Sequence, residues 1–522
     1  MVFCYKIYSW INDFNGGKHM GTNKKNNTVF IFSIILAVIV AGWAVKFSKN
    51  FEAVSGAAFA FLTNDFAWLY LFVVLAFVAF LLFIAFSKYG NIKLGADDSK
   101  PDYSTLSWFA MLFGCGMGVG LVFYGVAEPV SHFVSPPAGS GIEAGTQEAA
   151  EFAMRSSFMH WGFEPWACYA IVGLALAYFM FRRNKEGLLS TVLEPLIGEK
   201  QVNGTSGKIV DILATFATLA GVVTSLGLGT MQISSGLNYL FGIPSILVVY
   251  IAIIVIITII VVWSAMSGIG KGIKIISDAN LYIALGFMII AFIVGPKVPI
   301  LNDLVNSLGQ YLQNFVQDSL TVHPFGDNSW VASWRVYYWA WFIAWGPFVG
   351  VFIARISKGR TIREFIMGVM LAPALASFVW FSIFGTLGLN LGINGTLSME
   401  EMGEIAANPS VGLFVVFSKY PLGLVLSIIA IVLLCTFFIT SANSGTFVLS
   451  MLTSNGNLNP PQRNKIIWGV LQAATAIGLL RAGGLKPLQT ISIVAAFPFI
   501  FIMVMTAIST IKALKNDEKL KK

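Results

Sequence analysis

Long apolar stretches recur along the whole chain and are separated by short polar connections. A helix that crosses a bilayer needs about 20 mostly apolar residues, and twelve stretches reach that length. The pattern therefore predicts an all-α polytopic membrane protein with twelve transmembrane helices. The predicted spans are residues 28–47, 66–87, 106–127, 157–181, 209–238, 243–266, 278–299, 334–356, 364–390, 422–445, 465–482 and 488–511.

The third span contains glycines at every second position, in the stretch FGCGMGVGLVFYGVAEP. They are Gly114, Gly116, Gly118 and Gly120. Each glycine inside a helix costs roughly 1 kcal/mol relative to alanine. Small residues spaced by four allow helices to pack closely, whereas a locally unwound helix exposes backbone carbonyls to an ion or a substrate. Glycines on all faces exceed the need of one packing stripe, and we expect unwinding.

The composition agrees with a membrane protein and excludes several other classes. The chain is 57% hydrophobic and 11% charged, whereas soluble domains carry about 25% charged residues. The net charge of +8 does not indicate nucleic-acid binding, because the basic residues lie in loops. The four cysteines have no spacing typical of a metal site or a disulfide.

Lysine and arginine are unevenly distributed among the loops. They concentrate after the even-numbered spans, for example at Arg182 and Arg355, and acidic residues fill the opposite loops. The positive-inside rule then predicts that residues 1–27 and 512–522 are cytoplasmic tails of a plasma-membrane protein. The basic C-terminal tail can contact anionic membrane lipid. Met20 is an alternative to Met1 as the start of translation. Residues 300–320 are predicted to form an amphipathic surface helix.

Aromatic residues gather in the fourth and eighth spans. Trp161, Trp166 and Tyr169 lie in HWGFEPWACY, and Trp341 and Trp345 lie in WRVYYWAWFIAW. Interfacial belts place such residues at span ends, but these rings run deep into the helices. Facing aromatic rings can hold a quaternary ammonium group by cation–π attraction. Core or lipid-facing packing of the same rings is the alternative.

Polar groups also occur inside predicted spans. The tenth span contains FFITSANSG, with Thr440 and Ser441. Their hydroxyls either satisfy carbonyls of their own helix or serve as oxygen ligands for a hard cation. Glu164 is a candidate counter-charge for an onium group or a proton carrier, or it lies solvated near the outer interface. We expect it instead to pair with a base, because charged residues within a span usually have a partner. Glu128, before Pro129 at a span end, is expected to cap or gate rather than bind substrate.

Together these motifs resemble the betaine/choline/carnitine transporter family over roughly residues 25–511. The most specific are HWGFEPWACYAIVGLALAY and YYWAWFIAWGPFVGVFIARISKGRTIREF. The resemblance implies a LeuT-type fold, in which two helices precede two inverted five-helix repeats, spans 3–7 (about 106–299) and 8–12 (about 334–511). It also implies a homotrimer, alternating access, and small onium solutes as substrates.

The resemblance also assigns roles to individual residues. Aromatic substrate positions match Trp161, Trp166, Tyr169, Trp341 and Trp345, with Phe342 where relatives often carry tryptophan. Met117, Gly118 and Gly120 match the glycine-rich substrate segment, and glycine at 120 is typical of betaine rather than choline transporters. One sodium site maps to Gly114, Met117, Phe437, Thr440 and Ser441. A second maps to Thr218 and Phe348, but Val222 replaces its other threonine.

The functional prediction is a secondary transporter, not an enzyme, with no cofactor besides sodium as coupling ion. It is expected to import glycine betaine or a related quaternary-ammonium zwitterion together with sodium. The alternative within transport is a sodium-independent substrate/product antiporter of the carnitine type. The residues leave open which onium solute is carried.

Overall fold

The protein was analysed as a computed structural model that describes residues 27–116, 118–267 and 270–517. All regular secondary structure in these ranges is helical, as predicted, and an isolated bridge joins Lys93 to Thr361. The choice between Met1 and Met20 and residues 518–522 of the C-terminal tail lie outside the described residues.

The helices follow one another through the chain with short connections. They are α2 (Thr28–Lys46), α3 (Ser48–Phe86), η1 (Lys88–Asn91), α4 (Thr105–Gly116), α5 (Val119–Val134), α6 (Gln147–Trp161), α7 (Phe163–Ala177), η2 (Tyr178–Arg182), α8 (Leu189–Val192), α9 (Glu194–Ile197), α10 (Glu199–Val202), α11 (Thr205–Phe241), α12 (Leu247–Ser267), α13 (Gly270–Val294), α14 (Lys297–Leu320), η3 (Val331–Val336), α15 (Tyr337–Ile356), α16 (Ile362–Ile393), α17 (Met399–Ala407), α18 (Pro409–Ser418), α19 (Gly423–Leu452), α20 (Gln462–Arg481) and α21 (Leu485–Lys515).

Each of the twelve predicted spans coincides with a helix or a pair of helices, but the count of twelve crossings is not confirmed. By length and composition, nine segments of the described chain can cross a membrane, or ten if α13 and α14 form one bent span. The three predicted spans outside these nine are α4 with α5, α13, and α20. The last helix, α21, continues to Lys515, beyond the predicted boundary at 511.

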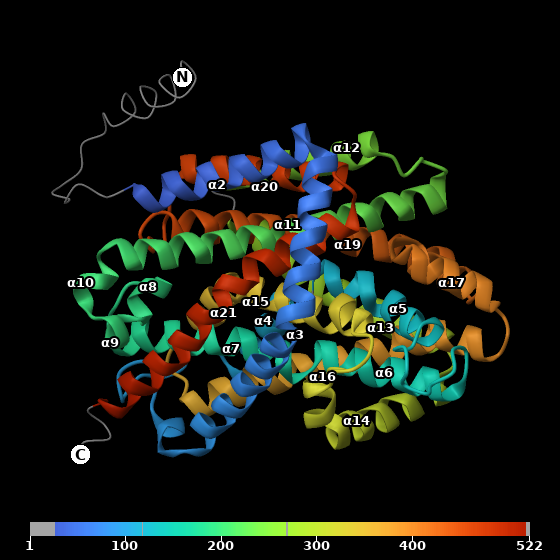
Figure 1. Cartoon of the computed structure of the whole chain (residues 1–522), viewed down its shortest axis with the longest axis horizontal. Coiled ribbons are helices and arrows are strands. Elements are labelled where there is room, and N and C mark those ends of the chain that lie inside the picture. The colour runs from blue at the N-terminus through green and yellow to red at the C-terminus, as the bar shows by residue number, and fades with distance from the viewer. Residues whose placement is uncertain (1–26, 117, 268–269, 518–522) are drawn as a thin grey trace.

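The division into two groups of five that the resemblance implies stays a prediction. It would place α4 with α5, α6 with α7, α11, α12 and α13 in the first group, and α15, α16, α19, α20 and α21 in the second. The most extensive packing joins α7 of the first group to α15 of the second, and α11 packs against α15, α19 and α21. In Figure 1, α2, α11 and α20 run in similar directions while α3 crosses the bundle.

Two of the predicted spans are interrupted at glycine residues. The third span stops at Gly116 and resumes at Val119, with Gly118 in an extended conformation, so the predicted break is present. The fourth span is divided at Gly162, which the sequence did not predict. A side chain there would lie 2.6 Å from the Tyr311 hydroxyl, which accepts a hydrogen bond from the Phe163 backbone N–H at 3.0 Å. Glycine at 162 therefore lets α14 approach the break.

The amphipathic helix predicted at 300–320 forms as α14 and meets α13 at an angle of 114°. Its apolar residues are divided between the core and the surface. Leu304, Leu308 and Phe315 pack against the core, whereas Leu301 and Leu312 are about half exposed.

Candidate functional site

One cavity lies between the broken third span and the aromatic helices. Its volume is about 60 Å³, well below the 300–1,000 Å³ that is typical of ligand pockets. Side chains therefore close over this space in the state described. Residues from α4, α5, α6, α7, α11, α15 and α19 line it: Gly114, Gly118, Val119, Gly120, Leu121, Trp161, Tyr169, Ser225, Trp341, Phe342, Trp345, Phe437, Thr440 and Ser441.

Aromatic rings form one side of the cavity. The Trp161 ring meets Trp341 at 6.3 Å between centroids and 89°, and Phe342 at 5.7 Å and 86°. Tyr169 meets Phe342 edge-on at 5.9 Å. Edge-to-face contacts of this kind are favourable and hold each ring in one orientation. The rings of the fourth and eighth spans thus face one another, as the aromatic pattern predicted.

Gly120 permits the close approach of these rings to α5. A Cβ atom at this position would lie 2.4 Å from Cη2 of Trp341 and 3.2 Å from Cη2 of Trp161. Gly118 differs, because a Cβ there would meet no atom within 4 Å. The two glycines therefore act differently: one makes room for indole rings, and the other lies at the break of the helix.

The opposite side of the cavity carries oxygen atoms. Thr440 and Ser441 reach it from α19, beside Phe437, and Gly114 reaches it from the end of α4. The Thr440 hydroxyl donates to carbonyls of its own helix, those of Thr436 at 3.0 Å and Phe437 at 3.1 Å. Its lone pairs stay available as acceptors, and Asn280 Nδ2 donates to it at 3.3 Å. Met117 lies outside the described residues.

Three predicted site residues are not among those lining the cavity. Trp166 packs edge-on against Tyr169, at 5.4 Å between centroids. Phe348 packs against Trp345 at 4.8 Å. The buried Thr218 hydroxyl donates to the Ala214 carbonyl at 2.9 Å.

The predicted second ion site gains no additional hydroxyl from the structure. Val222 is buried and contributes no ligand atom. The neighbouring Thr224 is bonded to α21, through the Leu488 carbonyl and the Ser492 hydroxyl, each at 2.8 Å. The second sodium site stays a prediction from the resemblance.

Sequence reasoning missed several residues at or behind the cavity. Ser225, Val119 and Leu121 line it, and Ser225 is the first residue of the motif SLGLGTMQ. Glu128 does not cap a helix end, because α5 continues to Val134 and the carboxylate is completely buried. Glu164 is also completely buried rather than solvated, and accepts a hydrogen bond from Ser319 at 2.7 Å.

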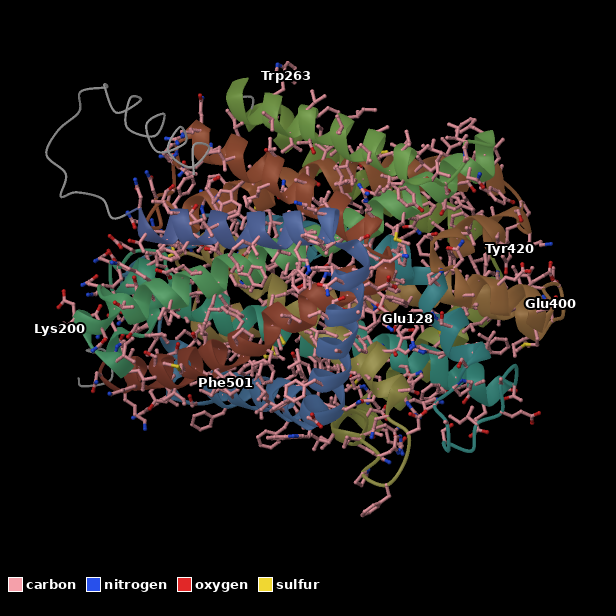
Figure 2. The ribbon with its side chains drawn as sticks, turned by 45° about the horizontal axis from the view of Figure 1, so that its top comes forward. Glu128, Lys200, Trp263, Glu400, Tyr420 and Phe501 are labelled. Atoms are coloured by element: carbon pink, nitrogen blue, oxygen red, sulfur yellow. The ribbon has the colours of Figure 1, made fainter. Side chains whose placement is uncertain are left out.

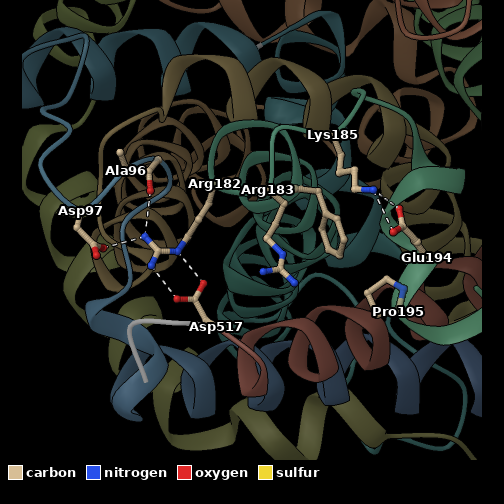
Figure 3. Close-up of a pocket in the computed structure, with 10 residues that line it drawn as sticks. Ala96, Asp97, Arg182, Arg183, Lys185, Glu194, Pro195 and Asp517 are labelled. Atoms are coloured by element: carbon tan, nitrogen blue, oxygen red, sulfur yellow. Dashed lines mark hydrogen bonds and ion pairs between the residues drawn. The ribbon is translucent and has the colours of Figure 1, made fainter. Parts of the chain in front are cut away.

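A larger cavity of about 480 Å³ opens where Asp517, just after α21, meets the connection after the fourth span. Its charged groups are largely engaged with each other (Figure 3). Arg182 binds Asp517 at 2.6 Å and Asp97 at 2.9 Å, and Lys185 binds Glu194 at 2.8 Å. This arrangement ties the end of α21 to the helical core, and the aromatic cavity remains the better candidate for a solute site.

Known proteins match the chain along nearly its whole length. The family described as "BCCT, betaine/carnitine/choline family transporter" matches residues 28–519. The glycine betaine transporter OpuD of Bacillus subtilis is 47% identical, over 94% of this chain and 95% of its own. An ectoine/hydroxyectoine transporter of Virgibacillus pantothenticus is 42% identical, over 96% and 99%. A solved Na+-coupled sialic acid symporter, in a substrate-bound outward-open state, is similar with a TM-score of 0.43 and 14% identity, over 84% of this chain and 95% of that chain.

The family match and the full-length relatives agree with the motifs in the broken third span, the aromatic fourth and eighth spans, and the tenth span. The relatives are transporters rather than enzymes. This multi-pass membrane protein belongs to the betaine/carnitine/choline family of transporters.

Proposed function

We propose that this protein imports glycine betaine, or a closely related onium zwitterion, by sodium-coupled alternating access. The observation that carries the proposal is the meeting of three features at one cavity. Aromatic rings from α6, α7 and α15 face the broken third span, and hydroxyls of α19 lie beside the same break. The glycine betaine transporter at 47% identity supports this substrate.

The rings suit the cationic end of the solute. A desolvated ammonium over an aromatic face gains about 2 kcal/mol, and Trp161, Trp341 and Phe342 present such faces within one cluster. Phe342 attracts a cation less strongly than the tryptophan common in relatives, because the face of indole is more electron-rich than that of benzene. The remaining indoles supply most of the attraction.

The break in the third span suits the anionic end. The first backbone N–H groups of α5 follow Gly118 and lack partners within their own helix, and such helix ends favour carboxylates. Within the described chain, the buried Trp341 indole N–H also lacks a hydrogen-bond partner. A carboxylate beside Gly118 and Trp341 would satisfy both kinds of donor.

Sodium is proposed to bind between the broken span and α19. The hydroxyls of Thr440 and Ser441 and the carbonyls of Gly114 and Phe437 are the hard oxygen ligands that such a cation prefers. A bound ion would link α4 to α19 across the cavity, and would favour solute binding by holding that arrangement. This linkage gives a physical basis for coupling.

The proposal is tested by uptake of radiolabelled glycine betaine into proteoliposomes, with and without an inward sodium gradient. Unlabelled ectoine, carnitine and choline serve as competitors. We expect sodium-driven accumulation, with betaine the best competitor. Uptake that ignores sodium but needs internal solute would identify an antiporter. Stronger competition by ectoine would transfer the substrate assignment to the solute of the 42% identical relative.

The ion site has its own test in Thr440→Ala. Loss of one ligand should raise the sodium concentration for half-maximal uptake about tenfold, the equivalent of about 1.4 kcal/mol. Thr436→Ala is the matched control, because Thr436 lies one turn earlier in α19 and its hydroxyl donates to the Val432 carbonyl. Equal sodium dependence in both variants would refute the assignment of Thr440.

The homotrimer and the cytoplasmic position of both termini stay predictions. Crosslinking in native membranes tests the first, and labelling of single cysteines in the tails tests the second.

A further inference from the structure

A carboxylate is buried directly behind the aromatic cavity. Glu128 lies on α5 with no exposed surface, and Figure 2 shows it inside the helix bundle. Its Oε2 atom accepts a hydrogen bond from Trp161 Nε1 at 2.9 Å and another from the Tyr338 hydroxyl. Trp161 is a ring of the cavity, so the carboxylate is one bond removed from the surface that a solute touches.

The other oxygen of Glu128 faces two histidines. His160 Nδ1 lies 2.7 Å from Oε1, and His132 Nε2 lies 3.5 Å from the same atom. Trp330 Nε1 donates to His132 Nδ1 at 3.2 Å. Because an indole nitrogen can only donate, the proton of a neutral His132 resides on Nε2, on the side of Glu128. The groups around this carboxylate are therefore donors directed at an anion.

A metal ion is a poorer explanation of the same cluster. Glu128, His132 and His160 offer ligand atoms within 4.8 Å of one another. Coordination through His132 Nε2 would need a lone pair there. That state would move the proton to Nδ1 and break the hydrogen bond from Trp330. The observed bonding favours a carboxylate held by N–H and O–H donors.

Apart from the two histidines, the negative charge of Glu128 has no lysine or arginine of the described chain against it. Among the described residues, no lysine or arginine nitrogen lies within 4.0 Å of its oxygens. Arg335, a basic residue of the same region, instead donates to the Asp318 carbonyl. A buried charge in a medium of low polarity acts over a longer range than one in water.

We infer that Glu128 sets the preference of the cavity for a positively charged solute. The carboxylate draws the Trp161 N–H and the Tyr338 O–H toward itself, which makes the Trp161 ring face more negative, and it adds a direct attraction for the onium group. Glu128 does not line the cavity and acts through the Trp161 ring and through its charge, so it is a positioning residue. This inference rests on the proposed function, because it presumes an onium solute among the rings.

Two ligands of the same shape distinguish an effect of charge on binding from an effect of packing. Glycine betaine carries a trimethylammonium group, and 3,3-dimethylbutanoate carries a tert-butyl group in its place and has no positive charge. Both are measured as competitors against radiolabelled betaine on purified protein. In Glu128→Gln we expect betaine to bind about tenfold more weakly, while the affinity for the carbon analogue stays the same or improves. The ratio of the betaine affinity to the analogue affinity is independent of the fraction of protein that is folded.

Glu164→Gln is the matched control. It makes the same change at another completely buried carboxylate, only three residues from Trp161 in sequence. The contacts of Glu164 run to α14 instead, to Ser319 at 2.7 Å and Tyr311 at 3.5 Å. We expect Glu164→Gln to leave the ratio of betaine affinity to analogue affinity unchanged. Glu128→Asp keeps the charge and should retain most of the preference for betaine.

A second pair of variants keeps the inference testable if Glu128→Gln is not recovered folded. Trp161→Phe removes an indole bonded to Glu128, and Trp341→Phe removes an indole whose N–H has no partner in the described chain. Trp161→Phe should lower the ratio of the betaine affinity to the analogue affinity more than Trp341→Phe does.

Three results would overturn the inference. The first two are an equal loss of affinity for both ligands in Glu128→Gln, and an equal affinity ratio in the two phenylalanine variants. Inhibition of the wild type by zinc that is lost in Glu128→Gln would also overturn it, in favour of a metal site. Failure of the wild type to bind betaine would instead refute the proposed function.

Discussion

Replacing Gly120 by alanine tests the closest approach between the broken span and the aromatic rings. The new Cβ would lie 2.4 Å from Cη2 of Trp341, where ordinary contacts are 3.4–4 Å. The indole would have to move by about 1 Å, the difference between these contact distances. It cannot do so freely, because it stacks on Tyr337 at 10° between planes and meets Trp161 edge-on.

Overpacking of this kind costs about 1–3 kcal/mol. If the displaced ring is the one that receives the solute, betaine should bind about 5- to 150-fold more weakly. The stability of the protein should change less, because alanine favours the first turn of α5 by roughly 1 kcal/mol relative to glycine. The assay is competition binding of betaine, with the melting temperature of the purified protein measured in parallel.

Gly42→Ala is the control, at an exposed glycine of α2 that does not line the cavity. Its Cβ would meet no atom within 4 Å. We expect an affinity within about threefold of the wild type, since surface changes cost within about 0.5 kcal/mol. Normal affinity of Gly120→Ala, or equal loss in both variants, would refute the argument that ring contact at Gly120 matters for betaine binding.

Two further predictions concern contacts far from the cavity. Tyr70→Phe removes the hydrogen bond from α3 to the Ile493 carbonyl at 3.0 Å. It should cost about 1 kcal/mol of stability and leave the betaine affinity unchanged. An unchanged melting temperature would contradict this prediction. Asp517→Asn weakens the two-pronged contact with Arg182, at 2.6 and 2.7 Å, and should cost about 1–3 kcal/mol. Faster proteolysis at the end of α21 would report this loss, and wild-type resistance would argue against it.

Much of the architecture follows from the sequence, because bilayer thickness imposes a length on every apolar helix. Each predicted span has a helical counterpart, and the glycine stretch is broken where the alternating pattern indicated. The break at Gly162 was not predicted, because the group that bonds the Phe163 N–H there is the Tyr311 hydroxyl of α14, almost 150 residues away. A single glycine carries no local sign of such a contact.

The candidate site shows the same division between local and distant causes. Trp161, Trp341 and Phe342 could be predicted to share a site because aromatic residues deep in a span are unusual, and the family motifs align them. The partners of Glu128 could not be predicted, since they lie on α6 and α15 and only the fold brings them together. Trp166 was expected among the lining residues, but it packs behind Tyr169.

The Glu128 network also has a consequence for the biosynthesis of the protein. A carboxylate in the centre of a bilayer costs about 2.5–3.5 kcal/mol without partners, and the hydroxyl that binds Oε2 comes from Tyr338, 210 residues later. At 5–20 residues per second, the ribosome needs about 10 to 40 s to supply that partner. During this interval Glu128 has partners on α5 and α6 but lacks the Tyr338 hydroxyl. The bonding of its carboxylate is therefore complete only once α15, from the second half of the bundle, has been made.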